Sequence, residues 1–319
     1  MSDPAVRDVW RHVEAWVASH ADAPVPVPGR GRTWPRMELL ADVAGGDLSV
    51  GRLIEGHLDA LAILDELGRS PTGPGVYGVW AARRPGELVA SPDGDGWWLQ
   101  GAKPFCSGAG LLSRALVVAD APDGVRLFDL DVDGVVVVEG TWPAVGMAGS
   151  ASNRVCWPGQ LVKPDEAVGP PGSYTDRIGF WWGAAGVAAC WWGGARALLR
   201  VVRDDLARGD PGDAELAELG AGWATLDAAG AVLRQAAAQI DAQDGDDKEG
   251  ARRTALVTRH AVHHACVDVL AAAGAAGGAR PICLDPEQSR RSADLYAYLA
   301  QQHRGRDAAA LGRMAVQQR

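Results

Sequence analysis

Apolar residues recur at helical spacing in the first part of the chain. Between residues 4 and 20, Val9, Val13 and Val17 fall near one face of a helix, with polar residues around them. The same periodicity predicts two further helices, over residues 35–44 and 48–67. The N-terminal part is therefore expected to be helical.

After about residue 75 the spacing changes to short runs rich in β-branched and aromatic residues. Turn-forming segments, such as 92–96 and 121–124, separate these runs. The predicted strands are 88–90, 97–100, 115–119, 125–130, 135–139 and 153–157. Frequent short strands with such turns predict a small antiparallel β-barrel or sandwich.

Beyond Pro170-Pro171-Gly172 the helical spacing returns and continues to the end of the chain. The predicted helices are 176–208, 213–241, 247–273 and 286–304. Four long helices with short connections predict an antiparallel four-helix bundle. The sequence thus indicates an α+β protein with a helical domain over 1–72, a β domain over 73–168 and a helical bundle over 169–319.

Composition narrows the classes of function. The chain has 319 residues, 47% of them apolar, and a net charge of -9, which argues against a protein that binds nucleic acid through a basic face. No apolar run reaches the length of about 20 residues that spans a bilayer. The five cysteines are far apart and form no Cys-x-x-Cys pair, which favours a reducing compartment. We therefore expect a cytoplasmic protein without a membrane partner.

One segment carries a specific signal. The run Gly101-Ala102-Lys103-Pro104-Phe105-Cys106-Ser107-Gly108 follows a short strand and resembles the flavin-contacting segment of the acyl-CoA dehydrogenase superfamily. Two further segments, Glu55 to Ala60 and Gly146-Met147 with the small residues after it, occur in the order that this family shows. The resemblance spans roughly residues 48–319 and implies the same layout of helices, β-barrel and helical bundle, with a shortened N-terminal domain.

The resemblance also implies a flavin site. Phe105 would lie against the isoalloxazine ring, Ser107 would hydrogen-bond near its N5 atom, and Gly108 would allow a close approach of the backbone. Cys106 lies between them, and Tyr77 to Trp80 resembles the first flavin-contacting strand of the family, which assigns Tyr77 and Val79 to the cofactor. The implied cofactor is FAD. The alternative for Phe105 and Ser107 is an ordinary strand end and turn.

The catalytic base of the family's dehydrogenases is missing. The positions that correspond to the usual glutamate fall near Leu299, Ala300 and Gln301, and none of these side chains can usefully accept a proton. His303 stands nearby and can exchange protons near neutral pH, so it is the candidate catalytic residue. The alternative is a solvated helix end, in which Arg304 and Arg306 complement the C-terminal helix dipole.

Three other groups of residues are candidate sites. His260, His263 and His264 share one helix face with Asp268, but no further ligand completes a metal site, and no metal is predicted. The segment 149–152, Gly-Ser-Ala-Ser, can contact a ligand phosphate or form a plain turn. Two adjacent tryptophan pairs, 181–182 and 191–192, favour a bundle core or a subunit interface over a ligand wall.

The leading functional prediction is an FAD-dependent oxidoreductase that oxidises an acyl thioester or another small molecule. Two alternatives remain: a flavin-dependent monooxygenase of the same fold, and a non-catalytic paralogue that serves as a binding or assembly subunit. The family resemblance implies a homodimer or homotetramer, and the missing base also leaves room for a hetero-oligomer whose partner completes the site.

Overall fold

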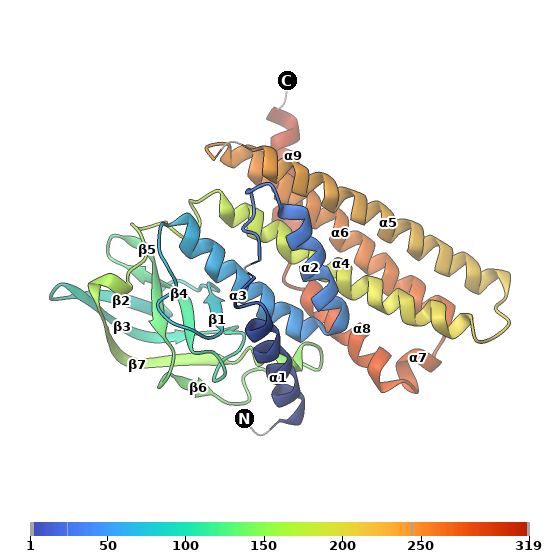
Figure 1. The fold of residues 1–319 in the computed structure, drawn as a ribbon, viewed down its shortest axis with the longest axis horizontal. Helices are drawn as coiled ribbons and strands as arrows, with labels where there is room; N and C mark the ends of the chain where they lie inside the picture. Colours follow the sequence, from blue (N-terminus) through green and yellow to red (C-terminus); the bar gives the residue numbers. More distant parts are fainter. Residues whose placement is uncertain (1–2, 24, 244, 318–319) are drawn as a thin grey trace. The chain divides into compact units, whose positions relative to one another are not determined.

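The computed structural model describes residues 3–23, 25–243 and 245–317 of the chain. Its order of elements is helices, then strands, then helices (Figure 1). The longer helices are α1 (Pro4–Ser19), α2 (Thr33–Gly46), α3 (Leu48–Glu66), α4 (Gly179–Leu206), α5 (Asp213–Ala242), α6 (Lys248–Gly277), α8 (Pro286–Leu299) and α9 (Arg304–Gln317), and α7 (Arg280–Cys283) is a single turn. The strands are β1 (Tyr77–Trp80), β2 (Leu88–Asp93), β3 (Gly96–Lys103), β4 (Arg114–Ala121), β5 (Gly124–Asp131), β6 (Val136–Val138) and β7 (Arg154–Val162).

The chain divides into two compact units, each built from separate stretches of sequence. The first unit comprises residues 1–25, 52–143 and 148–180, and the second comprises residues 26–51, 144–147 and 181–319. The three-domain division at residues 72 and 168 stays a prediction. Of the helices that the structure describes, none is both long and apolar enough to cross a membrane.

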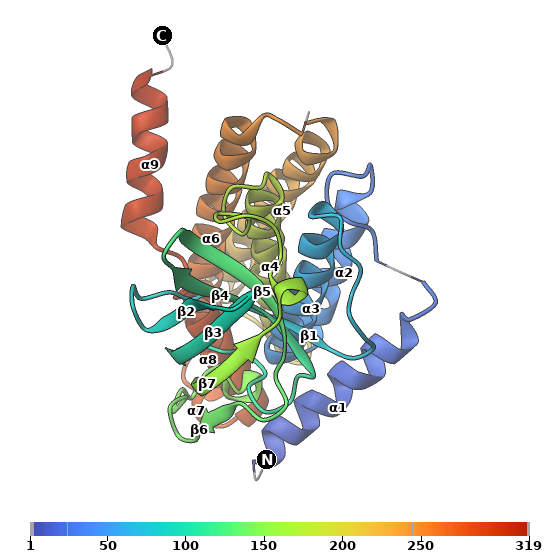
Figure 2. The ribbon, with the colours of Figure 1, turned by 90° about the vertical axis from the view of Figure 1, so that its left-hand side faces the viewer.

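We call the first unit the β unit and the second the helical unit. The β unit contains one curled sheet in the order β1-β4-β2-β3-β7-β6, with β5 paired to β4 (Figures 1 and 2). Most neighbours are antiparallel, as predicted. However, β1 runs parallel to β4, and β2 meets β4 through one parallel pair. The sheet is therefore an open half-barrel with both parallel and antiparallel neighbours. Its parallel pair arises because β1, which precedes the first hairpin, pairs with β4 at the edge of the sheet instead of forming a hairpin of its own.

A helix covers part of this sheet. Ala60, Ile63 and Leu64 of α3 pack against side chains from the strands and from the segment after β7, which are Tyr77, Leu116, Val118, Leu127 and Val168. All eight residues are nearly or fully buried. The apolar spacing that predicted α3 thus also supplies the face that closes the core of the β unit.

The helical unit is built around long neighbouring helices, and α5 and α6 pack against each other along an extensive contact (Figure 1). Helix α2 crosses α4 closely, since a Cβ atom at Gly193 would lie only 2.0 Å from the carbonyl oxygen of Ala41. Only glycine permits this approach of two backbones. The predicted C-terminal helical bundle is confirmed.

The last part of the chain differs from the prediction. Helix α8 ends at Leu299, and a separate helix, α9, begins at Arg304. Ala310 and Met314 of α9 are buried against Leu256 of α6, and this packing stabilises a helix that the glycine and the charges at its start do not favour. Arg304 and Arg306 therefore lie in the first turn of a helix, and the interpretation of both as C-terminal charges of the preceding helix is wrong.

Candidate functional site

The turn after β3 has a strained backbone that is hydrogen-bonded to the segment before β7. Phe105 has a φ of +58°, a left-handed conformation that costs about 1–2 kcal/mol for a residue with a side chain. The turn is fixed to the segment before β7, because the amide of Cys106 donates to the carbonyl of Asn153 at 3.0 Å and the amide of Gly108 donates to Ser150 at 2.8 Å. Strain kept in place by such bonds is typical of binding sites.

Phe105 itself is presented to the outside. Its residue is 57% exposed, and its ring meets the ring of Trp142 edge to face, with centroids 6.3 Å apart and planes at 90°. A large aromatic side chain stabilises the fold mainly when it is buried, so an exposed Phe105 contributes little to the stability of the isolated protein. A flat ligand that covered Phe105 would supply that burial.

A chain of hydroxyl groups lies beside the turn. The Oγ atom of Ser107 is 2.9 Å from the Oγ atom of Ser152, which is 2.9 Å from the Oγ atom of Ser150. Ser107 is half-buried, whereas Ser150 and Ser152 are buried. The indole of Trp80 donates to the carbonyl oxygen of Ser107 at 2.9 Å and fixes the backbone there. Ser107 thus offers a hydroxyl that can donate or accept at the edge of a ligand.

Gly108 has the conformation that the motif requires. Its φ is +74°, and a Cβ atom there would come within 2.9 Å of the side chain of Leu112. Both facts favour glycine at this position. Together with the aromatic pair and the hydroxyl chain, this close backbone makes the turn fit one face and one edge of a planar heteroaromatic ring.

Two other residues of the predicted flavin segment point inward. Cys106 is fully buried, its Sγ atom donates to the carbonyl of Lys103 at 3.4 Å, and burial raises the pKa of its thiol to about 12. Lys103 is also buried and donates from Nζ to the carbonyl of Ala82 at 2.6 Å. Burial lowers the pKa of its ammonium group to about 8, against the opposing influence of Asp120 and Glu87. Neither side chain is available to a ligand on the outer face of the turn.

The predicted contacts from β1 are similarly limited. The ring of Tyr77 belongs to the buried core of the β unit, and its hydroxyl accepts a hydrogen bond from the amide of Thr72 at 2.8 Å. Its own amide donates to Nδ1 of His57 at 3.1 Å, which gives that histidine a structural role. Val79 is half-buried and packs at the edge of the same core. Tyr77 and Val79 can therefore reach a cofactor mainly through their backbone.

His303 lies in the other unit, on the short connection between α8 and α9. It is exposed, and its carbonyl accepts the amide of Asp307 at 2.9 Å at the start of α9. The preceding residue, Gln302, is only 7% exposed. Within the described part of the chain, neither heteroatom of the Gln302 side chain has a hydrogen-bond partner. This connection therefore pairs an accessible imidazole with a buried amide whose bonding is incomplete.

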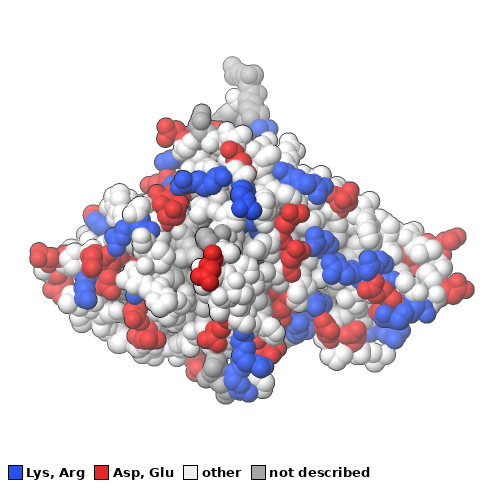
Figure 3. Space-filling model, in the orientation of Figure 1, with Lys and Arg blue, Asp and Glu red and all other residues white. Residues whose placement is uncertain are grey.

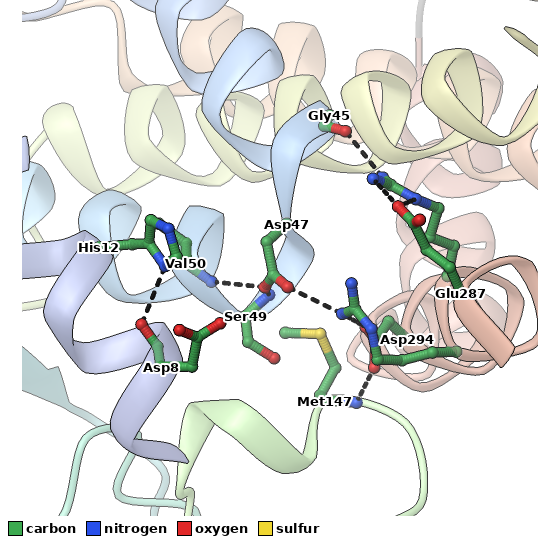
Figure 4. A network of polar contacts seen from close by, with 11 residues as sticks. Asp8, His12, Gly45, Asp47, Ser49, Val50, Met147, Glu287 and Asp294 are labelled. Carbon is green, nitrogen blue, oxygen red and sulfur yellow. Dashed lines mark hydrogen bonds and ion pairs between the residues drawn. The ribbon is translucent and has the colours of Figure 1, made fainter. Parts of the chain in front are cut away.

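The end of α8 has no proton-accepting side chain at the positions where the resemblance to acyl-CoA dehydrogenases places the catalytic base. Leu299 is buried, and Ala300 and Gln301 are exposed. The buried carboxylate on this helix is Asp294, which accepts the amide of Met147 at 2.5 Å and the guanidinium of Arg290 at 2.9 Å (Figure 4). Burial raises the pKa of Asp294, while both of these donors act in the opposite direction.

The Asp294 network extends to the start of α3. Arg290 also binds Asp47 at 2.8 Å, and Asp47 accepts the amides of Ser49 and Val50 at 2.8 and 3.0 Å, which caps the helix (Figure 4). Every carboxylate in this network is occupied by donors within the protein. We interpret it as a structural tie rather than as a reactive group.

Sequence reasoning missed part of the site. Trp142 and Phe105 are 37 positions apart, and nothing in their local patterns links them. The sequence indicates only a turn or a phosphate contact for the segment 149–152. Its two serines instead complete the hydroxyl chain, and Ala151 within it has a φ of +44°. Among the described residues, no group of three or more histidine, cysteine or acidic side chains could hold a metal ion.

Similarity to known proteins is visible in structure rather than in sequence. No protein-family model and no curated protein matches the chain. Solved structures do match. The dibenzothiophene monooxygenase TdsC from Paenibacillus sp. A11-2, in complex with FMN and indole, superimposes with a TM-score of 0.77 at 21% identity, over 89% of this chain and 83% of that one.

Two further structures agree. KijD3, in complex with FMN and dTDP-3-amino-2,3,6-trideoxy-4-keto-3-methyl-D-glucose, has a TM-score of 0.80 at 19% identity, over 99% of this chain and 95% of that one. The methanesulfinate monooxygenase MsuC from Pseudomonas fluorescens has a TM-score of 0.77 at 17% identity, over 89% and 83% of the two chains. The protein thus has the acyl-CoA dehydrogenase-like fold, with N-terminal helices, a curled β half-barrel and a C-terminal helical bundle.

Proposed function

We propose that this protein is a flavin-dependent monooxygenase that acts on a small organic molecule. In such a reaction one atom of dioxygen enters the substrate and the other leaves as water, with two electrons supplied by reduced flavin from a separate reductase. The observation that carries the proposal is the exposed ring of Phe105 on its strained turn, beside the Ser107 hydroxyl chain. The fold supports it, since TdsC and KijD3 were solved with FMN.

The residues of the turn would hold the flavin. Phe105, backed by Trp142, provides an aromatic wall for one face of the ring, and the hydroxyl of Ser107 provides a partner for a ring nitrogen. Gly108 lets the backbone approach. The reduced flavin supplies the electrons that activate dioxygen, and the protein positions the ring and the substrate.

The choice between FMN and the predicted FAD depends on atoms beyond the ring. The contacts described above concern only the isoalloxazine ring, which both cofactors share. The resemblance to acyl-CoA dehydrogenases implies a Phe-Gly pair that holds the FAD of a neighbouring subunit, and this chain has Ala207 to Pro211 there, without such a pair. A parallel titration with FMN and FAD distinguishes the two.

The residues at the end of α8 favour oxygenation over dehydrogenation. Removing the α-proton of an acyl thioester needs a carboxylate base, and Leu299, Ala300 and Gln301 occupy the positions where the family resemblance places it. Oxygen activation by reduced flavin needs no such base. We therefore favour the monooxygenase over the acyl-thioester dehydrogenase.

Flavin binding tests the proposal. Anaerobic titration with reduced FMN, followed by tryptophan fluorescence, should give a saturable signal. Phe105→Ala should weaken binding about tenfold because the ring loses its aromatic wall, and Ser107→Ala should weaken it about fivefold. Trp98→Ala removes a 41% exposed aromatic side chain from β3 of the same unit and should leave the affinity unchanged.

The outcomes separate the three functions. Oxygen consumption that depends on substrate, flavin and a reductase supports the monooxygenase. Bleaching of bound FAD by an acyl thioester under anaerobic conditions would instead support the dehydrogenase. A protein that binds neither reduced nor oxidised flavin would contradict both enzymes and leave the binding or assembly subunit.

We further propose His303 as the proton-exchanging catalytic residue, on the basis of its accessibility and its imidazole chemistry. His303→Asn should lower the rate of product formation about 100-fold and leave the affinity for reduced flavin unchanged. His12→Asn, which removes an imidazole from α1, serves as the control. Equal rates for wild type and His303→Asn across pH 5–9 would exclude this role.

A further inference from the structure

The helical unit contains a cavity that the proposed function does not use. It lies between α4 and α5 and has a volume of about 320 Å³, at the lower end of the range for small-molecule sites. Its floor is apolar, because Leu199 and Leu226 are 3% and 5% exposed. Figure 3 shows basic side chains gathered, with acidic ones between them, over the part of the molecule where Figure 1 draws α4 and α5.

Two tryptophans form the walls of this cavity. Trp192 is nearly buried, its indole donates to the carbonyl of Leu226 at 2.9 Å, and its ring meets Trp34 at a centroid distance of 6.3 Å. Trp223, on α5, is 52% exposed. One wall is therefore fixed in orientation, while the other presents an indole that a ligand could cover.

Three arginines of α4 line the same cavity. Arg196 stacks on Trp192, with its guanidinium 4.6 Å from the ring centroid, and pairs with Asp42 at 2.6 Å. Arg203 pairs with Asp204 at 2.6 Å. Arg200 is exposed and forms neither a hydrogen bond nor an ion pair with any residue that the structure describes. The guanidinium of Arg200 is therefore available to bind an anion.

One acidic residue completes the lining. Asp227, one turn after Trp223 on α5, is the single carboxylate in a lining that has three arginines. A carboxylate there repels a simple anion but accepts hydrogen bonds from hydroxyl or amino groups. The lining therefore matches a ligand that has both an anionic group and hydrogen-bond donors.

We propose that this cavity binds a nucleotide, meaning a planar base linked through a sugar to a phosphate. The base lies against Trp223 over the leucine floor, Arg200 binds the phosphate, and Asp227 accepts a hydrogen bond from a sugar hydroxyl or a base amino group. Arginine and tryptophan suit these two parts of the ligand through charge-assisted hydrogen bonds and ring stacking. The cavity belongs to one unit, and the turn that carries Phe105 belongs to the other.

Equilibrium dialysis of the full-length protein with AMP tests the proposal. AMP should bind more tightly than adenosine or inorganic phosphate, and binding should weaken as salt is raised. Arg200→Gln and Trp223→Ala should each weaken AMP binding about tenfold. Arg253→Gln removes another exposed arginine, from α6, and should have no effect. AMP should also bind equally well to Phe105→Ala and in the presence of reduced FMN.

Three results would overturn the proposal. AMP binding that is absent at millimolar concentration would do so, as would AMP binding that both cavity variants leave intact. The third is a change of sedimentation coefficient in Trp223→Ala without any AMP binding, which would make this face a contact between copies of the chain. Both variants alter exposed side chains, so a failure to fold is not expected to obscure the answer.

Discussion

Phe105, Met147 and Ala151 are the described residues with a side chain that lie in the left-handed backbone region, and the first two of them have opposite surroundings. Phe105 in the β unit is exposed, and its neighbour Ser107 has a hydroxyl that can turn toward a ligand. Met147 in the helical unit, with a φ of +61°, is buried, and its amide is bound by the buried carboxylate of Asp294. Strain alone therefore does not mark a site. The difference is whether the strained segment leaves groups available for a ligand or uses them all within the protein.

The largest expected effect comes from breaking the internal tie. Asp294→Ala removes the acceptor of the Met147 amide and one carboxylate partner of Arg290, and it should lower the free energy of unfolding by about 3 kcal/mol. Asp294→Asn should cost less, because an amide oxygen can still accept from Met147. Urea unfolding measures both.

Asp42→Ala is the control for this prediction. It breaks an ion pair whose carboxylate is 70% exposed and should change the free energy of unfolding by less than about 1 kcal/mol. If Asp42→Ala and Asp294→Ala lowered the free energy of unfolding equally, the buried network would contribute no more to stability than an exposed ion pair does.

Lys103 gives a prediction for the other unit that depends on pH. Its pKa in the folded protein is about 8, below its ordinary value of 10.5, so both states are protonated at pH 7 and the folded state bears the cost of a buried charge. Between pH 8 and 10.5 the unfolded chain binds more protons, so this group's contribution to stability rises with pH. The shift corresponds to about 3 kcal/mol.

The variant Lys103→Met isolates that contribution. The free energy of unfolding of Lys103→Met, taken relative to the wild type, should be higher at pH 7 than at pH 10. The reason is that the wild type bears the cost of a buried charge only where Lys103 is protonated, and the neutral methionine never bears it. Urea unfolding of both proteins at pH 7, 8.5 and 10 measures the difference, from which the titration of other groups cancels. A difference in stability that stays constant over this range would contradict the lowered pKa.

The smallest effect on stability is expected at the turn that carries Phe105. Phe105→Gly relieves the left-handed strain but makes the unfolded chain more flexible, so the free energy of unfolding should rise by no more than about 1 kcal/mol or stay unchanged. The affinity for reduced flavin should fall as in Phe105→Ala. A large loss of stability in Phe105→Gly would show that the ring is held for packing with Trp142 rather than for a ligand.

The comparison also explains which features the sequence predicts. The helices and most strands follow from the spacing of apolar residues, because each buries one face, as α3 does with Ala60, Ile63 and Leu64. The motif from Gly101 to Gly108 identifies the turn through its glycines and its aromatic residue. The local sequence pattern is therefore enough to predict both the secondary-structure elements and this turn.

Other features depend on contacts between distant residues. The parallel pairing of β1 with β4 joins Tyr77 to Arg114 and has no local signal. Helix α9 begins with Arg-Gly-Arg, an unfavourable start, and forms because Ala310 and Met314 find an apolar surface on α6. The edge-to-face contact of Phe105 with Trp142 and the burial of the Cys106 thiol likewise depend on how the turn is held against residues 150–153.

The three serines beside the turn determine whether Ser107 donates or accepts a hydrogen bond. Each hydroxyl has a single hydrogen, so the bonds among Ser107, Ser152 and Ser150 can run in either of two directions. In one direction the oxygen of Ser107 faces outward with its lone pairs, and in the other Ser107 offers its hydrogen. Rotation of the three hydroxyls switches between them without placing a charge on the protein. A ligand atom at Ser107 can therefore be met in its protonated and its unprotonated form by the same three side chains.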